Sequence, residues 1–138
     1  METLEQLLHQ RLAKLKALQE AQGNPYLSSF RRDGSVQEIL NRFEDGKELS
    51  AAGRLTAIRS HAKTTFSDVA DQTGKIQILF SETSLGENYA HAANLDLGDI
   101  IAIKGSCFIT KTNERTLRVS EWHLLSKAIR PLPEKWHG

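Results

Sequence analysis

Hydrophobic side chains are spaced in two different ways along this chain, and the change falls near residue 49. In residues 3–22 and 35–43, apolar residues recur every three or four positions, which is the spacing of one face of a helix. From Leu49 onward they form short runs bounded by Gly, Asn and Asp, which is typical of strands. The pattern therefore predicts helices first and a β structure after them.

Two helices are expected before residue 49. The first spans residues 3–22 and ends at Gly23, because Pro25 prevents it from resuming. It carries a leucine stripe, which we interpret as a packing face, formed by Leu4, Leu7, Leu8, Leu15 and Leu18. The second begins after Ser35, whose spacing to Glu38 is that of a capping box. Its apolar face consists of Val36, Ile39, Leu40 and Phe43.

Five strands are expected after residue 48. They cover residues 49–61, 63–71, 75–81, 99–110 and 115–125. Turns at residues 72–74 and 112–113 form hairpins, and residues 86–95 predict a helix between the third and fourth strands. Five strands with a helix after the third are the layout of an OB-fold. We therefore expect a mainly β chain with appended α structure: a five-stranded Greek-key barrel preceded by N-terminal helices.

Alternation along the second and third strands indicates which side chains face the barrel interior. The inward side of the third strand consists of Ile76, Ile78 and Phe80. Gln77 then faces outward with Lys75 and Leu79, and Phe66 lies on the polar side of the second strand, opposite to Val69. An exposed aromatic ring among polar neighbours is unfavourable unless something flat stacks on it, and a nucleobase is the obvious candidate. If the strand register slips by one residue, Phe66 is instead a core residue.

The same rule applies to the first and fifth strands. In the fifth strand, the inward residues are Leu117 and Val119, and the outward residues are Thr116 and Arg118. Strict alternation places Arg59 on the same side as Leu55 and Ala57, so exposure of Arg59 requires a bend or bulge in a long first strand.

Charge limits the kind of partner that this chain can bind. The formal net charge is +1; residues 1–50 carry 7 basic and 8 acidic side chains, and the remaining residues carry 11 and 9. Neither part resembles a generic polyanion binder, so any contact with nucleic acid must use a small site of defined geometry and not a broad basic surface. The single cysteine, Cys107, excludes an internal disulfide and is expected to be a buried, small apolar residue.

Length and composition exclude several further classes. A chain of 138 residues suits one main domain with an appendage and is too short for most catalytic domains that carry a cofactor site. No apolar run approaches the roughly 18 residues that span a bilayer, and residues 1–5 lack the features of a secretion signal. The five histidines show no ligand spacing, so no metal site is expected. We expect a cytoplasmic protein with no membrane partner.

Several motifs resemble the N-terminal anticodon-binding domain of bacterial-type lysyl-tRNA synthetases, which are class II enzymes. They cover nearly the whole chain: Gly23-Asn24-Pro25-Tyr26 with Phe30, Ala52-Gly53-Arg54, Arg59 through Lys63 to Phe66, Gly74-Lys75-Ile76-Gln77, Leu97-Gly98-Asp99-Ile100-Ile101 with Gly105, Thr110-Lys111-Thr112-Asn113-Glu114, Leu125-Ser126-Lys127, and Arg130-Pro131-Leu132-Pro133-Glu134-Lys135-Trp136-His137-Gly138. The barrel motifs alone are shared with aspartyl- and asparaginyl-type relatives. Where the family has a methionine–glycine pair before the lysine, this chain has His61-Ala62, so the turn into Phe66 is expected to differ.

The resemblance implies a role for four residues in reading the anticodon. Phe66 matches the aromatic residue that stacks on the central anticodon uridine, and Gln77 and Arg59 match the groups that hydrogen-bond that base. Glu114 matches the acidic residue that reads an outer anticodon base. The expected phosphate contacts are Lys63, Lys111 and Arg115. Without the resemblance, Gln77 and Glu114 would be ordinary exposed polar residues and Arg59 could simply cap one end of the barrel.

The resemblance also implies a division of the chain: residues 1–48 as a helical extension, 49–127 as the anticodon-binding domain, and 128–138 as the start of a linker. The linker would lead to a catalytic domain that this chain lacks, so we expect no catalytic residues and no activity from the chain alone. The parent enzyme would be a homodimeric lysine-tRNA ligase that uses ATP and magnesium. The alternatives are an aspartyl- or asparaginyl-type anticodon-binding domain, a generic single-strand-binding OB-fold, and a protein-interaction module built on the first helix.

Overall fold

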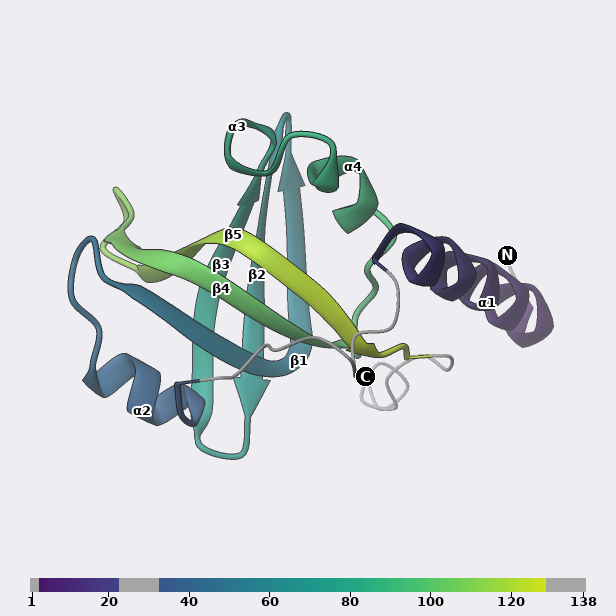
Figure 1. Cartoon of the computed structure of the whole chain (residues 1–138). Coiled ribbons are helices and arrows are strands. Elements are labelled where there is room, and N and C mark those ends of the chain that lie inside the picture. Colours follow the sequence, from purple (N-terminus) through teal and green to yellow (C-terminus); the bar gives the residue numbers. More distant parts are fainter. Residues whose placement is uncertain (1–2, 23–32, 129–138) are drawn as a thin grey trace.

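The structure, a computed structural model, describes residues 3–22 and 33–128 (Figure 1). Its elements are α1 (Leu4–Gln22), α2 (Val36–Asn41), β1 (Glu48–His61), β2 (Thr64–Asp71), β3 (Gly74–Ser81), α3 (Glu82–Leu85), α4 (Asn88–Ala92), β4 (Ile100–Ile109) and β5 (Arg115–Ser126). Every predicted strand is present, with ends within one residue of those expected. The predicted helix stop at Gly23 and Pro25, the Asn24-Pro25-Tyr26 motif and the linker beyond residue 128 lie outside the described residues. In the described ranges, no helix has the length and apolar character needed to cross a membrane.

The five strands close into a barrel with the order β1-β2-β3-β5-β4. All neighbouring strands are antiparallel except β3 and β5, which pair in parallel through residues 77–79 and 116–118. This arrangement confirms the predicted OB-fold. The parallel contact closes the barrel and brings β5 against β3, although the two strands are far apart in the sequence.

The helical segment between β3 and β4 differs from the prediction of one helix over residues 86–95. It contains two short helices, α3 and α4, and the first begins earlier, at Glu82, where the Ser81 side chain accepts a hydrogen bond from the Ser84 backbone N–H. Gly86 separates them with a φ of 57°, a left-handed conformation that interrupts a helix. This break explains why the composition alone overestimated the length of the helix.

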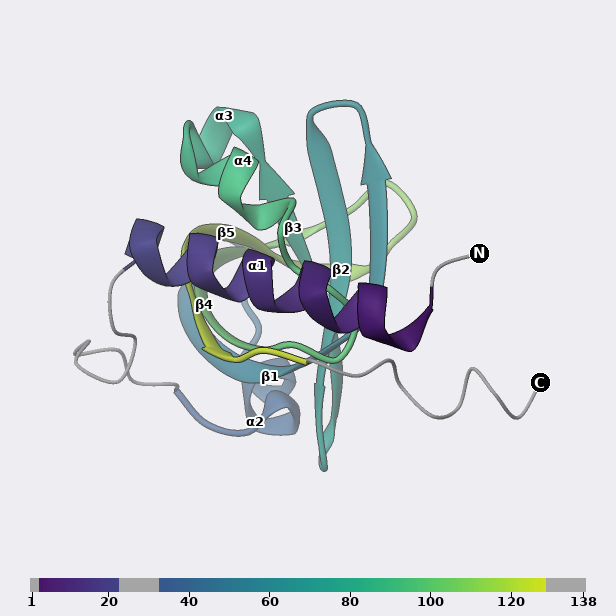
Figure 2. The same ribbon diagram turned by 90° about the vertical axis from the view of Figure 1, so that its right-hand side faces the viewer.

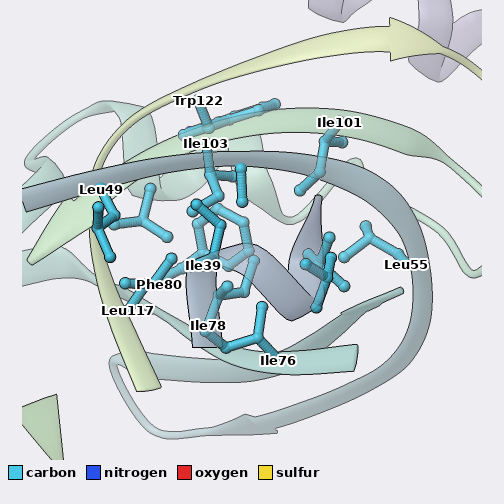
Figure 3. Close-up of a cluster of buried hydrophobic side chains, with 14 of the residues drawn as sticks. Ile39, Leu49, Leu55, Ile76, Ile78, Phe80, Ile101, Ile103, Leu117 and Trp122 are labelled. Carbon is cyan, nitrogen blue, oxygen red and sulfur yellow. The ribbon is translucent and has the colours of Figure 1, made fainter. Parts of the chain in front are cut away.

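Alternating residues from all five strands fill the barrel interior (Figure 3). The inward-facing residues predicted for β3 and β5 are all buried: Ile76, Ile78, Phe80, Leu117 and Val119. Phe80 packs edge-on against Trp122, with ring centroids 6.0 Å apart. Cys107 is 2% exposed, which confirms its expected buried position.

Helix α2 closes one end of this core. The predicted capping box is present, since the Ser35 hydroxyl accepts from the Glu38 N–H and the Glu38 carboxylate accepts from the Ser35 N–H. The helix places Val36 and Ile39 in the barrel core, where they are 1% and 0% exposed. Residues that precede β1 in the sequence therefore contribute directly to the core of the barrel.

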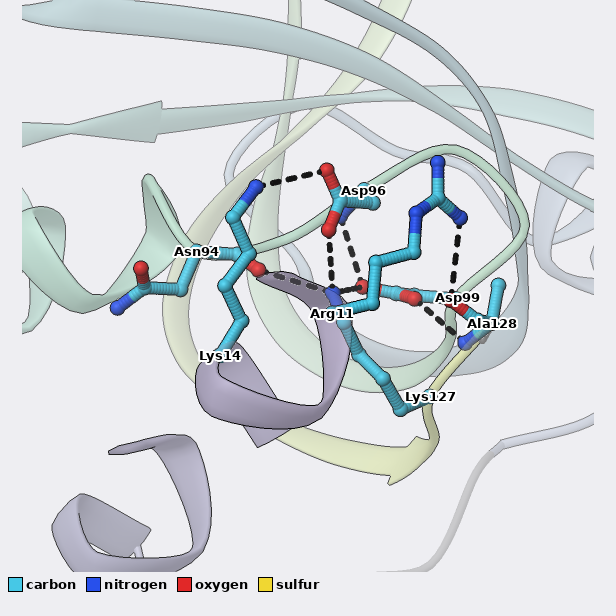
Figure 4. A network of polar contacts seen from close by, with 7 residues as sticks. All are labelled: Arg11, Lys14, Asn94, Asp96, Asp99, Lys127 and Ala128. Carbon is cyan, nitrogen blue, oxygen red and sulfur yellow. Dashed lines mark hydrogen bonds and ion pairs between the residues drawn. The ribbon is translucent and has the colours of Figure 1, made fainter. Parts of the chain in front are cut away.

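A buried lysine ties the end of β5 to the loop that precedes β4 (Figure 4). The Lys127 ammonium donates to Asp99 at 2.7 Å, to Asp96 at 2.8 Å and to the Asn94 carbonyl at 2.9 Å. The side chains of Lys127 and Asp99 are 1% and 0% exposed. Asp99 also accepts from the backbone N–H groups of Ala128 and Asp96, each at 2.8 Å. We call Lys127, Asp96 and Asp99 the Lys127 cluster.

Helix α1 lies to one side of the barrel and joins the Lys127 cluster from outside (Figure 1 and Figure 2). Lys14 donates to Asp96 at 3.0 Å, and Arg11 donates to the Ala128 carbonyl at 3.0 Å. Burial disfavours the ionised form of Asp96, but the hydrogen bonds and charges of Lys127 and Lys14 outweigh it and lower the pKa of this carboxyl. Of the predicted leucine stripe, Leu15 packs against the core, whereas Leu4 is 42% exposed.

Candidate nucleic-acid interface

Two neighbouring rows of side chains cross the outer surface of the barrel. Paired residues in a β ladder point to the same face, so the register defines the rows. The first row runs through Arg59, Phe66, Leu79, Arg118 and Ser106. The second row runs through Ala57, Asp68, Gln77, Thr116 and Phe108. Three of the four predicted base-contacting residues, Arg59, Phe66 and Gln77, therefore lie together on one face.

Arg59 reaches this face because β1 is irregular. The register with β2 shifts between Leu55 and Ala57, and this β-bulge reverses the alternation expected from Leu55. Leu55 is 0% exposed in the core, whereas the Arg59 side chain is 50% exposed. The structure thus contains the bulge that the exposure of Arg59 required.

Phe66 lies on the outer face, as the alternation predicted. It is partly exposed, and its neighbours Ser67 and Val69 face inward and are 1% and 0% exposed. In the first row it stands between Arg59 and Leu79. The interpretation of Phe66 as a core residue is therefore not supported by the register.

A chain of hydrogen bonds links the second row to Arg59. The Arg59 Nη2 atom donates to Gln77 Oε1 at 3.0 Å and to Asp68 Oδ1 at 3.2 Å. Gln77 Nε2 donates to Thr116 Oγ1 at 2.9 Å. Thr116 Oγ1 in turn donates to the Glu114 carbonyl at 3.2 Å. We call this series the Arg59–Gln77–Thr116 chain; it joins β1, β3 and β5 across the closure of the barrel.

Two residues lie on the outer face, as the alternation predicted, and are nevertheless buried. Thr116 points outward but is 0% exposed, since the Gln77 amide is hydrogen-bonded to it from the adjacent strand. Leu79 also points outward but is only 8% exposed, because it lies between Phe66 and Arg118 in the first row. Side chains on the neighbouring strands cover both residues. Alternation within a single strand gives the face on which a side chain lies, but not these neighbours.

Glu114 and Lys111 lie together in the β4–β5 hairpin. Both are exposed, and the hairpin is held by a hydrogen bond from the Thr110 N–H to the Glu114 carbonyl at 3.0 Å. Asn113 adopts a positive φ of 64° in this turn, which asparagine tolerates better than most residues. The Glu114 carbonyl belongs to the Arg59–Gln77–Thr116 chain, and so the hairpin adjoins the second row.

The other two predicted phosphate contacts occupy different places. Lys63 lies in the β1–β2 turn with its side chain 80% exposed, and its Nζ is 3.9 Å from the Glu82 carboxylate. The Arg115 guanidinium faces α2, where it donates to the Leu40 carbonyl at 3.4 Å and lies 5.8 Å from the Phe43 ring centroid. The structure therefore does not bring Lys63, Lys111 and Arg115 into one cluster.

The outer face also contains groups that received no role from the sequence. Asp68 holds Arg59, and its side chain is 16% exposed. The Arg118 guanidinium lies 4.5 Å from the Phe108 ring centroid, which is within cation–π range. The alternation along β5 placed Arg118 outward, but only the pairing of the strands shows what Asp68 and Arg118 contact. Within residues 3–22 and 33–128, no group of three or more His, Cys, Asp or Glu side chains is placed to hold a metal ion.

Comparisons with known proteins agree with this geometry. Residues 49–125 match the family model described as OB-fold nucleic acid binding domain. Nearly the whole chain is similar to part of several lysine–tRNA ligases. The Haemophilus influenzae protein is 44% identical over 93% of this chain and 28% of its own length, and the Thermoanaerobacter pseudethanolicus protein is 43% identical over 99% and 28%. Lysine–tRNA ligase 2 of Methanosarcina acetivorans is 45% identical over 93% of this chain and 26% of its own length. The chain thus spans between 26% and 28% of the length of these relatives.

Proposed function

This chain belongs to the family of OB-fold nucleic-acid-binding domains, and from that premise we propose that it is the anticodon-binding domain of a lysine–tRNA ligase. Its ligand would be the uridine-rich anticodon loop of lysine tRNA. Support comes from the similarity to lysine–tRNA ligases over nearly the whole chain and from the two rows on the outer face. The parent enzyme, a cytoplasmic homodimer in this proposal, would use ATP and magnesium to attach lysine to its tRNA.

The central uridine would stack on Phe66. Base–aromatic stacking contributes about 1–3 kcal/mol and accepts any base, so it provides affinity without selectivity. Arg59 and Gln77 would supply the selectivity, because uracil carries two carbonyl acceptors and one N–H donor on its edges. Arg59 can only donate, whereas the Gln77 amide both donates and accepts.

The remaining predicted contacts would lie around this central site. Glu114, in the hairpin beside the second row, would read an outer anticodon base. Lys63 and Lys111 would meet phosphates at the two exposed turns. Arg115 would contact a phosphate through N–H groups that are not directed at Leu40, since a guanidinium carries five donors.

The observation that carries the proposal is the Arg59–Gln77–Thr116 chain beside Phe66. A partly exposed aromatic ring is adjacent to polar groups that are hydrogen-bonded to one another and anchored on three strands. A sequence-tolerant binder requires aromatic rings and positive charge but no oriented amide, and the net charge here is only +1. The outer face therefore favours a base-selective role over a generic one.

The test is a fluorescence titration of this chain with a lysine anticodon stem-loop at one stated salt concentration. The same loop with cytosine at the central position and an unstructured oligonucleotide serve as competitors. We expect tighter binding to the uridine loop than to either competitor. Equal affinity for all three would instead assign a generic single-strand-binding role and refute anticodon reading.

The variant Phe66→Ala tests the stacking position. We expect it to weaken binding of the stem-loop by about 1–3 kcal/mol, because it removes the stacking surface, and to leave the melting transition cooperative. Leu12→Ala on α1 is the matched control, since it removes a side chain that is 51% exposed and distant in sequence from both rows. If the Phe66→Ala variant unfolds, or binds the stem-loop as tightly as the unsubstituted chain does, the assigned role of Phe66 is wrong.

A further inference from the structure

We propose that Thr116 is a positioning residue that fixes the orientation of the Gln77 side-chain amide, and that this orientation makes the site prefer uracil to cytosine. The inference rests on the proposed function and extends it to a residue that does not itself touch the base. Its starting point is that Thr116 is polar and 0% exposed, yet lies on the outer face directly beside Gln77.

The two neighbours of the Gln77 amide determine its orientation. A guanidinium has no acceptor, so the end of the amide that faces Arg59 Nη2 at 3.0 Å must be the oxygen. The nitrogen then faces Thr116 Oγ1 at 2.9 Å. Because the Thr116 hydroxyl donates its only proton to the Glu114 carbonyl at 3.2 Å, its oxygen is left as an acceptor for Gln77 Nε2.

The opposite orientation of the amide would be unfavourable at both ends. It would direct Gln77 Nε2 at the Arg59 guanidinium, with a donor facing a donor. It would also require the Thr116 hydroxyl to turn away from the Glu114 carbonyl in order to donate to Gln77 Oε1. Since Thr116 is fully buried, water cannot easily replace a lost partner there.

The fixed amide presents a defined edge to a base that stacks on Phe66. Its hydrogen bonds to Arg59 and Thr116 use one lone pair of Oε1 and one proton of Nε2, which leaves one acceptor site and one donor. Uracil offers a carbonyl acceptor next to its N3–H donor, so both can be satisfied. Cytosine offers an amino donor next to its unprotonated N3, which is the reverse order.

Cytosine could correct this mismatch in one of two ways. The base could turn over, but the backbone of the loop would hold its ribose and so fix which edge meets Gln77. Alternatively, the Gln77 amide could rotate, which the contacts with Arg59 and Thr116 oppose. The selectivity therefore depends on a threonine that the RNA does not contact.

The experiment measures the ratio of affinities for the uridine and cytosine stem-loops in variants of this chain. Thr116→Val removes the hydroxyl and keeps the shape, and Thr116→Ser is the control that keeps the hydroxyl. Thr116→Ala is measured as well, in case the valine variant does not fold, and thermal melting of each variant shows which ones are folded. Gln77→Ala and the double variant Gln77→Ala/Thr116→Val complete a double-mutant cycle.

We expect Thr116→Val to lower the preference for uridine by about two- to tenfold, which is the value of one neutral hydrogen bond expressed as a ratio of affinities. Thr116→Ser should restore most of the preference. In the Gln77→Ala background, the valine change should leave the remaining preference unchanged, because no amide is left to orient.

Other results would overturn the inference, and they are distinguishable from failure of the proposed function. If the unsubstituted chain prefers uridine and the folded Thr116→Val or Thr116→Ala variant keeps that preference, Thr116 does not orient Gln77. If these variants weaken both loops equally, Thr116 has only a structural role. If the unsubstituted chain itself shows no preference for uridine over cytosine, the proposed anticodon reading is wrong, and the inference about Thr116 is wrong with it.

Discussion

Replacement of Lys127 by methionine should destabilise this chain strongly. The Lys127 ammonium makes three hydrogen bonds of 2.7–2.9 Å, and its side chain is 1% exposed. Without it, the Asp99 carboxylate, which is 0% exposed, loses its cation. Removal of one partner from a buried ion pair costs about 3–5 kcal/mol. Asp99 keeps two backbone N–H donors and Asp96 keeps Lys14, so we expect a loss near the lower limit, about 3 kcal/mol.

The assay is equilibrium unfolding in urea at neutral pH, followed by far-ultraviolet circular dichroism. Lys104→Met is the matched control, because Lys104 forms a 3.3 Å ion pair with Glu48 in which the two side chains are 44% and 56% exposed. An exposed pair of this kind contributes about 0–1 kcal/mol. If Lys127→Met costs less than about 1 kcal/mol, or no more than Lys104→Met, then the buried cluster does not hold the barrel together as argued.

Three further predictions concern stability. The pKa of Asp96 is lower in the folded chain, so this carboxylate stabilises the fold above about pH 4, and the stabilisation is lost as the pH falls through the folded pKa. Asp96→Asn should therefore flatten the acid side of the plot of unfolding free energy against pH. An unchanged plot would contradict this. Ala62 has a φ of 53°, which favours glycine, so Ala62→Gly should raise the free energy of unfolding by about 0.5–1 kcal/mol and the urea midpoint with it. A lower midpoint would show that the turn is not strained. A Cβ at Gly105 would overlap the Arg118 carbonyl oxygen, so Gly105→Ala should lower the free energy of unfolding by about 1–3 kcal/mol. Gly74→Ala, whose Cβ would meet nothing nearer than 3.6 Å, should cost less, and equal melting temperatures of the two variants would refute the steric argument.

The fold was largely predictable because its strands obey a simple period. The alternation in β3 and β5 assigned the inward residues correctly, and the capping box at Ser35 located the start of α2. The bulge needed to expose Arg59 could also be inferred, because alternation from Leu55 made it necessary. These features depend on neighbours within a few positions, which a single sequence contains.

The burial of Thr116 and Leu79 could not be predicted in the same way. Thr116 is covered by Gln77, which lies 39 residues away and becomes its neighbour only through the parallel contact of β3 with β5. The contact of Arg115 with α2 also spans a long separation, 75 residues. Local patterns give the face of a side chain but not the cover that another strand provides, and so they missed the groups that orient the candidate site.

The positions of the candidate residues suggest how affinity and selectivity would be divided in this chain. Arg59, Phe66 and Gln77 lie on paired strands, where the ladder fixes their backbone and hydrogen bonds fix two of the side chains. Lys63 and Lys111 lie in turns and are exposed, so their charges can follow the phosphates of a flexible loop. Sites on strands hold their geometry more closely than sites on loops. Base selectivity would therefore be set when the barrel closes, before the RNA arrives, whereas the phosphate contacts would form as it binds.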